Sequence, residues 1–270
     1  MRRIGEDISE KLNFRPAQFY KEQHIRGKWV CGQCDTLTQQ AMPAHVIDKS
    51  IASAELLSHV LVSKYADHLP LYRQRQIFLR AGIDLSRSTL SDWVGRCGVE
   101  LEPLADALKH VVLQQWVIHA DETPVTIMRM GENEKKPKKG YVWAYATTQY
   151  NPVQAVIYDF QDSRSGQHAE EFLKGWQALC CYLDDGNLSI DNNWIENQMR
   201  PWALGRKNWL FAGSLRSGQR AANVMTLIQS AKLNGLDPYA YLSDVLKRLP
   251  THKVTQIEEL LPHRWKPNSN

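Results

Sequence analysis

Two adjacent carboxylates directly follow an apolar run in "QQWVIHADETPVTI", residues 114–127, where Asp121 and Glu122 come after the run 116–118. A charged side chain beside apolar residues is normally paired, hydrogen-bonded or bound to a metal, because burying a bare charge is costly. Side chains alternate along a strand, so Asp121 and Glu122 should point to opposite faces. The pattern predicts either that Asp121 is a metal ligand at a strand end, or that the strand end is polar and faces water, with Glu122 the more exposed.

A third carboxylate, Glu196, lies in "DNNWIENQMRPWALGRKNW", residues 191–209, among cationic side chains. Carboxylates from separate elements near basic residues are what a Mg2+ site for phosphate-ester chemistry requires. Alternatively, Glu196 pairs with Arg200 one helical turn later. Arg200, Arg206 and Lys207 are candidates for phosphate contacts, or they form a solvated basic face.

The segment "CGQC" holds Cys31 and Cys34 at the spacing of a zinc knuckle. A structural zinc site needs four ligands, usually from two such pairs, and the sequence has only this one. His24 and His45 are further candidate ligands, and an unmetallated turn is the alternative. The other three cysteines are expected to be small buried residues: they are Cys97, Cys180 and Cys181.

Residues 51–110 have apolar side chains at helical spacing. We expect one helix to begin after Pro70 and end at Gly82, and the next to be capped by Ser86 or Ser88. Two short helices around a glycine turn are typical of a helix-turn-helix, with an ordinary helical hairpin as the alternative. The basic residues in this region are Arg73, Arg75, Arg80, Arg87 and Arg96.

The region from 111 to 160 predicts an antiparallel meander of three strands. A helix capped by Ser163 or Ser165 is expected next. From 191 onward the pattern is helical again, with Asp191 as the expected N-cap and an amphipathic helix that ends at Gly235. The tryptophans expected in the core are Trp116, Trp143, Trp194, Trp202 and Trp209.

The composition is that of a soluble globular protein: of 270 residues, 43% are hydrophobic and 23% charged, which excludes a disordered chain. We find no apolar run of membrane-spanning length and no signal peptide. Five cysteines, an odd and low number, favour a reducing cytoplasm. The net charge of +4 permits a polyanionic partner without requiring one.

Three stretches resemble the transposases of the insertion-sequence-66 family: "HADETPV", "KYADHLPLYRQRQIFLRAGIDLSRSTLSDWVG" and "DNNWIENQMRPWALGRKNWLFAGS". The resemblance implies a bacterial DNA transposase with an RNase H-like core and a catalytic Asp, Asp, Glu (DDE) triad. It makes Asp121 the first catalytic Asp and Glu196 the catalytic Glu, both ligands of Mg2+, with Mn2+ as an alternative. It also makes residues 70–96 a DNA-binding region. The partners implied are DNA (element ends and target), further copies of the chain and accessory element-encoded proteins.

The chain departs from the family pattern in two places. The family's earlier CxxC pair would lie before "MRRIGED", so an N-terminal truncation is expected and a complete Zn2+ site is not. The strand with the second catalytic Asp and the insertion after it are expected to be missing, with a joint near Gln177 and Ala178. Asp184 and Asp185 are the carboxylates nearest that joint.

We therefore predict an α/β fold: an incomplete RNase H-like core with an N-terminal zinc-finger-like remnant and a helix-turn-helix-like region. The expected boundaries are 1–50 for the remnant, 51–110 for the DNA-binding region, 111–235 for the core and 236–270 for a helical tail. The predicted function is a Mg2+-dependent transposase in degenerate form. The alternative is a catalytically inactive DNA-binding relic that interferes with a full-length transposase.

Overall fold

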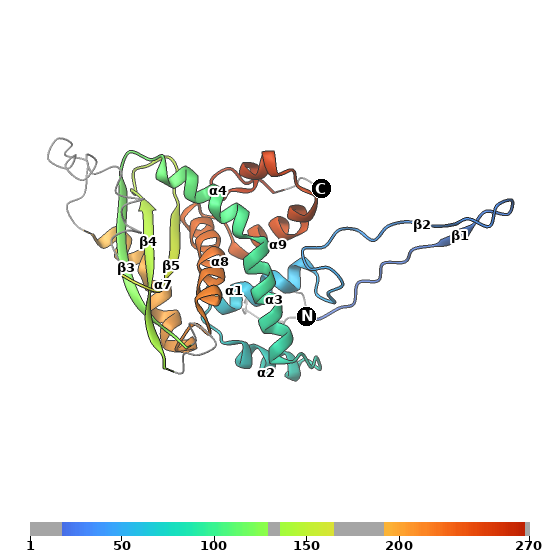
Figure 1. Cartoon of the computed structure of the whole chain (residues 1–270), viewed down its shortest axis with the longest axis horizontal. Coiled ribbons are helices and arrows are strands. Elements are labelled where there is room, and N and C mark those ends of the chain that lie inside the picture. The colour runs from blue at the N-terminus through green and yellow to red at the C-terminus, as the bar shows by residue number, and fades with distance from the viewer. Residues whose placement is uncertain (1–17, 129–135, 165–191, 268–270) are drawn as a thin grey trace, which may run out of the picture.

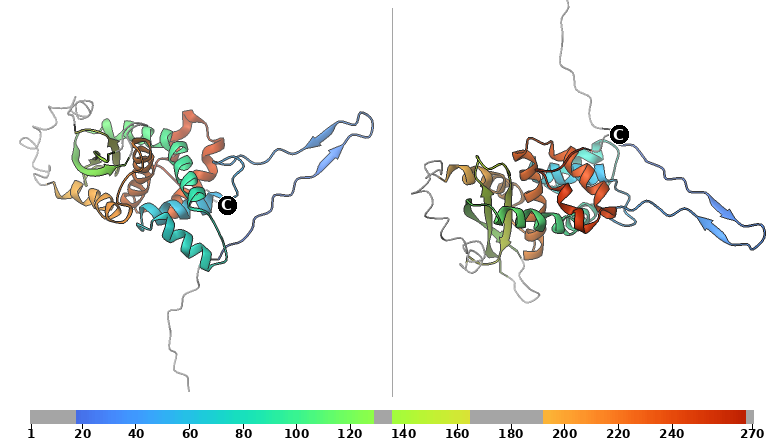
Figure 2. Two further views of the ribbon diagram at one scale, coloured as in Figure 1. Left: turned by 60° about the horizontal axis from the view of Figure 1, so that its bottom comes forward. Right: turned by 90° about the horizontal axis from the view of Figure 1, so that it is seen from above.

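The computed structural model of the protein describes residues 18–128, 136–164 and 192–267. The body is mixed α/β, as predicted, and a thin two-stranded arm extends away from it (Figure 1, Figure 2). The strands are β1 (Lys28–Val30), β2 (Leu37–Gln39), β3 (Ile118–Ile127), β4 (Lys138–Thr147) and β5 (Val156–Gln161). The α-helices are α1 (Ala54–Tyr65), α2 (Leu71–Arg80), α3 (Arg87–Glu100), α4 (Glu102–Leu113), α7 (Asn193–Trp209), α8 (Leu215–Leu233) and α9 (Pro238–Arg248). Two 3-10 helices follow, η2 (Leu249–Thr251) and η3 (Val254–Leu260).

The main sheet is an antiparallel meander in the order β3-β4-β5, which confirms the prediction from the sequence. Pro124 lies inside β3, and a proline is tolerated there because β3 is an edge strand of the described sheet. Asp121 was expected at a strand end, but it is the fourth residue of the ten-residue β3. Asp121 lies within the strand because the pairing of β3 with β4 continues to Ile127.

Helix α8 covers the other edge of the sheet. The Thr226 hydroxyl accepts a hydrogen bond from the Tyr158 backbone N–H at 2.9 Å. The Ser230 hydroxyl accepts from Val156 N–H at 3.0 Å and donates to Val156 C=O at 3.0 Å. An open sheet edge presents unpaired N–H and C=O groups, which can pair with a strand of another chain. The hydroxyls of α8 bind these groups of β5 and so protect this edge of the sheet.

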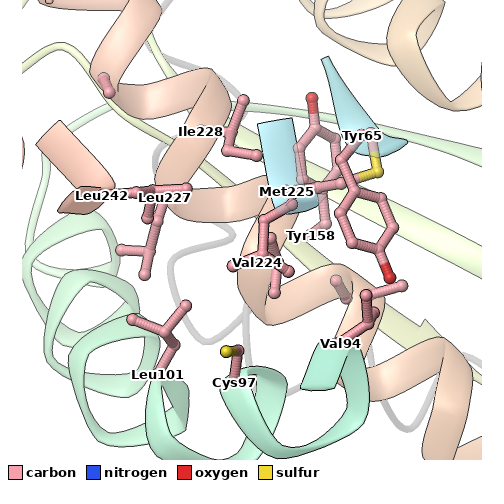
Figure 3. Close-up of a cluster of buried hydrophobic side chains, with 14 of the residues drawn as sticks. Tyr65, Val94, Cys97, Leu101, Tyr158, Val224, Met225, Leu227, Ile228 and Leu242 are labelled. Carbon is pink, nitrogen blue, oxygen red and sulfur yellow. The ribbon is translucent and has the colours of Figure 1, made fainter. Parts of the chain in front are cut away.

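The core surrounds α8 on all sides. Val224, Leu227 and Ile228 of α8 are fully buried, as the amphipathic pattern predicted. Figure 3 shows them between Tyr158 of the sheet and side chains of α1, α3 and α9, including Cys97. The segments 51–110 and 236–270, which the sequence predicts as separate regions, share this core. The domain boundaries therefore stay a prediction.

Local signals place the helix ends of residues 66–101 where the sequence predicts them. Helix α2 begins after Pro70, and Gly82 adopts a φ of 83° in the turn that follows. The Ser86 hydroxyl caps α3 by accepting from Thr89 N–H at 3.0 Å. Such caps stabilise a helix by about 1 kcal/mol.

The prediction that the tryptophans are buried holds for Trp202, which is 1% exposed, and is wrong for Trp116, which is 75% exposed. Trp116 lies in the connection between α4 and β3, so neither element buries it. Several expected features lie outside the described residues: the helix after Ser163 or Ser165, the N-cap Asp191, the joint at Gln177 and Ala178, and Cys180, Cys181, Asp184 and Asp185. The described helices include none with an apolar stretch sufficient to cross a lipid bilayer.

Candidate functional site

Asp121 lies on the face of the sheet that α7 covers. Residues opposite one another in antiparallel strands share a face, and the register places Asp121 beside Ala144 and Tyr158. The Tyr158 hydroxyl donates a hydrogen bond to the Gln198 carbonyl of α7, and burial raises the pKa of this phenol far above its usual value. The ring of Trp202 on α7 packs against Tyr158 with the centroids 5.9 Å apart. The helix that carries Glu196 is thus held against the face that bears Asp121.

Glu122 points to the opposite face, as strand alternation predicts, beside Trp143 and Asp159. Its carboxylate forms an ion pair with Arg164, and its side chain is 19% exposed. Arg164 thus neutralises the charge of Glu122, whose side chain is mostly buried. Burial, together with the charges of Asp159 and Glu122, raises the pKa of Tyr145 well above its usual value.

The Asp121 carboxylate lies at the outer edge of β3. Its Oδ1 accepts a hydrogen bond from the Glu122 backbone N–H at 2.8 Å. In an antiparallel strand, residues an even number of positions apart direct their N–H and C=O groups to the same side. Thr126 lies four residues after Glu122, and its C=O points away from β4 and accepts a hydrogen bond from Ala212 N–H at 2.8 Å. The Glu122 N–H therefore also points away from β4. Within the described part of the chain, Oδ2 of Asp121 has no hydrogen-bond or ion-pair partner. This oxygen is free to bind a ligand.

Glu196 is exposed on α7. At about 100° per residue, Glu196 lies about 80° around the helix from Arg206. Arg206 reaches the outer edge of β3, where Nη1 donates to the Pro124 C=O at 2.6 Å and to Thr123 Oγ1 at 3.1 Å. The structure thus places Asp121 on the sheet face that α7 covers and Glu196 on the exposed surface of that helix. No contact between them is recorded, and the described residues hold no group of three or more His, Cys, Asp or Glu side chains suited to a metal.

The basic side chains of α7 differ in their surroundings. Arg206 is committed in part to β3 through Thr123 and Pro124. Arg200 and Lys207 are exposed, and no ion pair joins Arg200 to Glu196 among the described residues. The alternative reading of Glu196 as a helical partner of Arg200 is therefore wrong for this structure. Arg200 and Lys207 are thus accessible cations on α7.

The predicted helix-turn-helix consists of α2, the turn at 81–86 and α3. Gln74 anchors α2 to α1 by donating to the carbonyls of Leu69 at 3.0 Å and Val60 at 3.2 Å. Of the basic residues proposed to bind DNA, Arg75 forms an ion pair with Asp84 at 3.0 Å. The others are exposed: Arg73, whose Nε lies 3.0 Å from the Tyr72 hydroxyl, and Arg87.

Arg87 is the first residue of α3. A cation is unfavourable at this end of a helix, because the helix dipole places positive charge there. Arg87 therefore does not serve helix stability. An anion bound at this end would contact both the arginine and the free backbone N–H groups of the first turn.

Cys31 and Cys34 are exposed at the turn of the arm, between β1 and β2. Cys34 Sγ lies 3.1 Å from Thr36 Oγ1. Hydrogen bonds from Thr36, and a weaker one from Cys31, lower the pKa of the Cys34 thiol. His24 and His45, expected as further zinc ligands, instead lie together at the base of the arm with their ring centroids 5.7 Å apart. Seven extended residues, about 23 Å, separate His24 from Cys31, so the histidines cannot complete the site.

The base of the arm also borders a cavity of about 910 Å3, which the sequence did not reveal. Its walls come from several segments far apart in the chain, including residues 18–24 and α1. His59 lines it, and burial lowers the pKa of its imidazole. The spacing of residues along the sequence does not predict this cavity, because its walls come together only where the arm meets the body.

Family comparisons match almost the whole chain. The model of the "Transposase IS66 family" matches residues 49–178 and 172–220. The "IS66 C-terminal element" matches residues 226–263, and the "zinc-finger binding domain of transposase IS66" matches residues 1–35. The main match is thus split into two segments that meet at residues 172–178, where the sequence predicts a joint.

Similar proteins occur in Sinorhizobium fredii. "Uncharacterized protein y4jD" is 29% identical over 393 aligned positions, which cover 98% of this chain and 76% of the relative. "Uncharacterized protein y4hP" is 26% identical over 394 positions, covering 98% and 71%. The alignments are much longer than the 270 residues of this chain, so each relative has internal residues without a counterpart here. No solved structure matches the chain.

Proposed function

Because this chain belongs to the IS66 family of transposases, we propose that it acts on DNA, with Asp121 and Glu196 as the carboxylates for phosphodiester cutting and joining. The observation that carries this proposal is the packing of α7, the helix that bears Glu196, on the face of the sheet that bears Asp121. The meander β3-β4-β5 followed by α7 is our candidate for an incomplete RNase H-like core.

The two carboxylates fit Mg2+ in part. Magnesium prefers oxygen ligands and is usually held by one or two carboxylates together with water and substrate phosphate. Oδ2 of Asp121 and the exposed carboxylate of Glu196 meet that requirement. When bound, the ion supplies charge stabilisation for the attacking and leaving oxygens. The Glu122 backbone N–H orients Asp121, and no third carboxylate joins the pair within the described residues.

DNA contacts are proposed for the exposed cations of two surfaces. On α2 and α3 these are Arg73 and Arg87, and Arg75 contributes after separation from Asp84. On α7 they are Arg200 and Lys207, with Arg206 reaching phosphate through the donors it does not use on β3. Phosphate contacts of this kind make affinity fall steeply with salt.

A second candidate function is a DNA-binding relic without catalytic activity. It is favoured by the split family match at 172–178 and by the greater internal length of the relatives. In this reading, the strand that would carry the second catalytic Asp is missing, and the chain occupies element ends in competition with a complete transposase. Asp184 or Asp185 would have to replace the missing ligand for the chain to cut DNA.

A cleavage assay with matched variants separates the two functions. The chain is incubated with labelled linear DNA that carries the element ends, with Mg2+ or Mn2+, as wild type, Asp121→Asn and Glu196→Gln. Glu122→Gln is the control, because it removes the neighbouring carboxylate on the opposite face of the sheet. We expect metal-dependent cutting that both test variants lose and the control retains.

Binding is measured in parallel at several salt concentrations. DNA binding without cutting in the wild type would establish the relic. Equal cutting by Asp121→Asn and Glu122→Gln would refute the assignment of Asp121. Absence of salt-sensitive DNA binding would refute both functions, because each depends on phosphate contacts.

A further inference from the structure

The turn between α7 and α8 presents two large apolar side chains to solvent. Leu210 is 66% exposed and Phe211 is 43% exposed. The backbone is fixed on both sides of this pair. On the α7 side, Leu210 N–H donates to the Arg206 C=O at 2.9 Å. On the β3 side, Ala212 N–H donates to the Thr126 C=O at 2.8 Å. The two side chains therefore belong to a turn whose position is set by the helix and the sheet together.

Leu210 has a backbone conformation that favours glycine. It is the C-cap of α7, with a φ of 71° and a ψ of −37°. For a bulky residue, positive φ costs free energy because the side chain approaches the backbone. Burial does not offset this cost, since most of the leucine side chain is in water. Strained residues of this kind cluster at sites that bind a ligand. The leucine side chain therefore points to contact with a partner rather than to the stability of the fold.

Exposed cations lie on the helix that leads to this turn. Arg200 and Lys207 are both exposed on α7, and at 100° per residue they lie within about 20° of each other around the helix axis. Lys207 comes three residues before Leu210, so the row of cations leads to the apolar pair. Cations followed by exposed apolar side chains match a polyanion that also has apolar faces. DNA has both, in its phosphates and its stacked bases.

We propose, resting on the function proposed above, that Leu210 and Phe211 form a wedge that enters bound DNA between two base pairs and unstacks them. Arg200 and Lys207 hold the phosphates next to the opened step. Apolar side chains that enter a base step in this way kink the duplex. The strained turn supplies the rigidity that a wedge needs, because the helix and the sheet both hold its backbone.

The length of α7 relates the wedge to the candidate catalytic carboxylate. Glu196 lies 14 residues before Leu210, which is about 21 Å along the helix axis. Base pairs are about 3.4 Å apart along the duplex. DNA that follows α7 would therefore be opened about six base pairs from the phosphodiester at Glu196. A wedge at that distance bends the duplex beside the cutting site.

Charge favours DNA over a second copy of the chain as the occupant of this surface. A two-fold contact through the apolar pair would bring Lys207 of both copies together, because this residue lies within one helical turn of Leu210. Like charges at short distance repel. Phosphates instead neutralise the same cations.

The test uses the full chain and duplexes of the element end, each with 2-aminopurine at one position. The fluorescence of this base rises when it unstacks from its neighbours. At saturating protein, we expect the wild type to raise it at one base step, and Leu210→Gly and Phe211→Ala to abolish the rise. Fluorescence anisotropy measures affinity in parallel. Phe211→Ala should weaken binding by about 5- to 150-fold, the contribution of one base stacked on an aromatic ring. The salt dependence should stay, because the phosphate contacts remain.

Leu210→Gly separates this role from a role in folding. Glycine adopts positive φ without strain, so the Tm of this variant should not fall, although the fluorescence rise is lost. The matched control is Val254→Ala, which removes an apolar side chain that is 80% exposed on η3. This control should keep both the affinity and the fluorescence rise.

The outcomes separate the wedge from the proposed function. Salt-sensitive binding with unchanged fluorescence at every position would overturn the wedge and leave DNA binding intact. A wild type that binds no DNA would overturn both. A fluorescence rise that persists in Leu210→Gly and Phe211→Ala, or that Val254→Ala also abolishes, would overturn the wedge. So would a DNA-free dimer, seen by light scattering, that Leu210→Gly dissociates, because the apolar pair would then bind a second copy.

Discussion

Replacing Ser230 with alanine should destabilise the protein far more than the loss of one surface hydroxyl would. The Ser230 side chain is fully buried on α8 and makes two hydrogen bonds at 3.0 Å, one to the N–H and one to the C=O of Val156. Ser230→Ala leaves both backbone groups buried without a partner. An unsatisfied buried group costs about 1–3 kcal/mol, so we expect a loss of about 2–5 kcal/mol.

Thermal or urea unfolding followed by circular dichroism measures this loss. For a protein of this size we expect a fall in Tm on the order of 10 °C. Ser243→Ala on α9 is the matched control: Ser243 is 8% exposed, and its hydroxyl has no hydrogen-bond partner among the described residues. Its removal should change the unfolding free energy by less than about 0.5 kcal/mol, or stabilise the protein.

Equal Tm values for the two variants would refute the reasoning. They would mean that Val156 finds other partners and that α8 does not close the edge of β5 through its side chains. A larger loss in Ser230→Ala alone would establish that this helix takes the place of a neighbouring strand.

Three further predictions follow from the packing and the titrating groups. Gly98→Ala should lower the unfolding free energy by about 1–3 kcal/mol, because the added Cβ would lie 2.7 Å from the Cβ of Arg220. Gly32→Ala, whose added Cβ would have no atom within 4 Å, should leave it unchanged in the same assay, and equal effects of the two variants would contradict this prediction. Burial lowers the pKa of Lys64 to about 8, so between about pH 8 and 10 the unfolded state binds more protons and the unfolding free energy should rise with pH, an increase that Lys64→Met should abolish. Burial also lowers the pKa of His59 below 6.5, so the unfolding free energy should fall as the pH drops below that value. The fall should be smaller in His59→Gln, and the same dependence of the unfolding free energy on pH in both proteins would contradict this prediction.

The sequence determined the elements whose signals are local. Pro70, Gly82 and Ser86 fix the ends of α2 and α3 through backbone restriction, positive φ and capping, and each acts within a few residues. The meander and the buried face of α8 follow from side-chain periodicity in the same way. Opposite faces for Asp121 and Glu122 could be predicted because alternation is a property of a single strand.

The tertiary structure decided what joins distant parts of the chain. Ser230 lies 74 residues from Val156, and no pattern in either segment indicates that a helix closes the edge of β5. Trp116 is exposed and His24 lies far from Cys31 for the same reason: neighbours in space are chosen by packing, not by spacing in sequence.

The candidate site shows both contributions. The residue types at 121 and 196 indicated carboxylate chemistry, and the family resemblance assigned their roles. Only the folded chain places Asp121 inside β3 with one oxygen free, and brings α7 against that strand through Arg206 and the Pro124 carbonyl. The physical reason is that a side chain's type is local, whereas its free atoms and neighbours depend on which elements pack together.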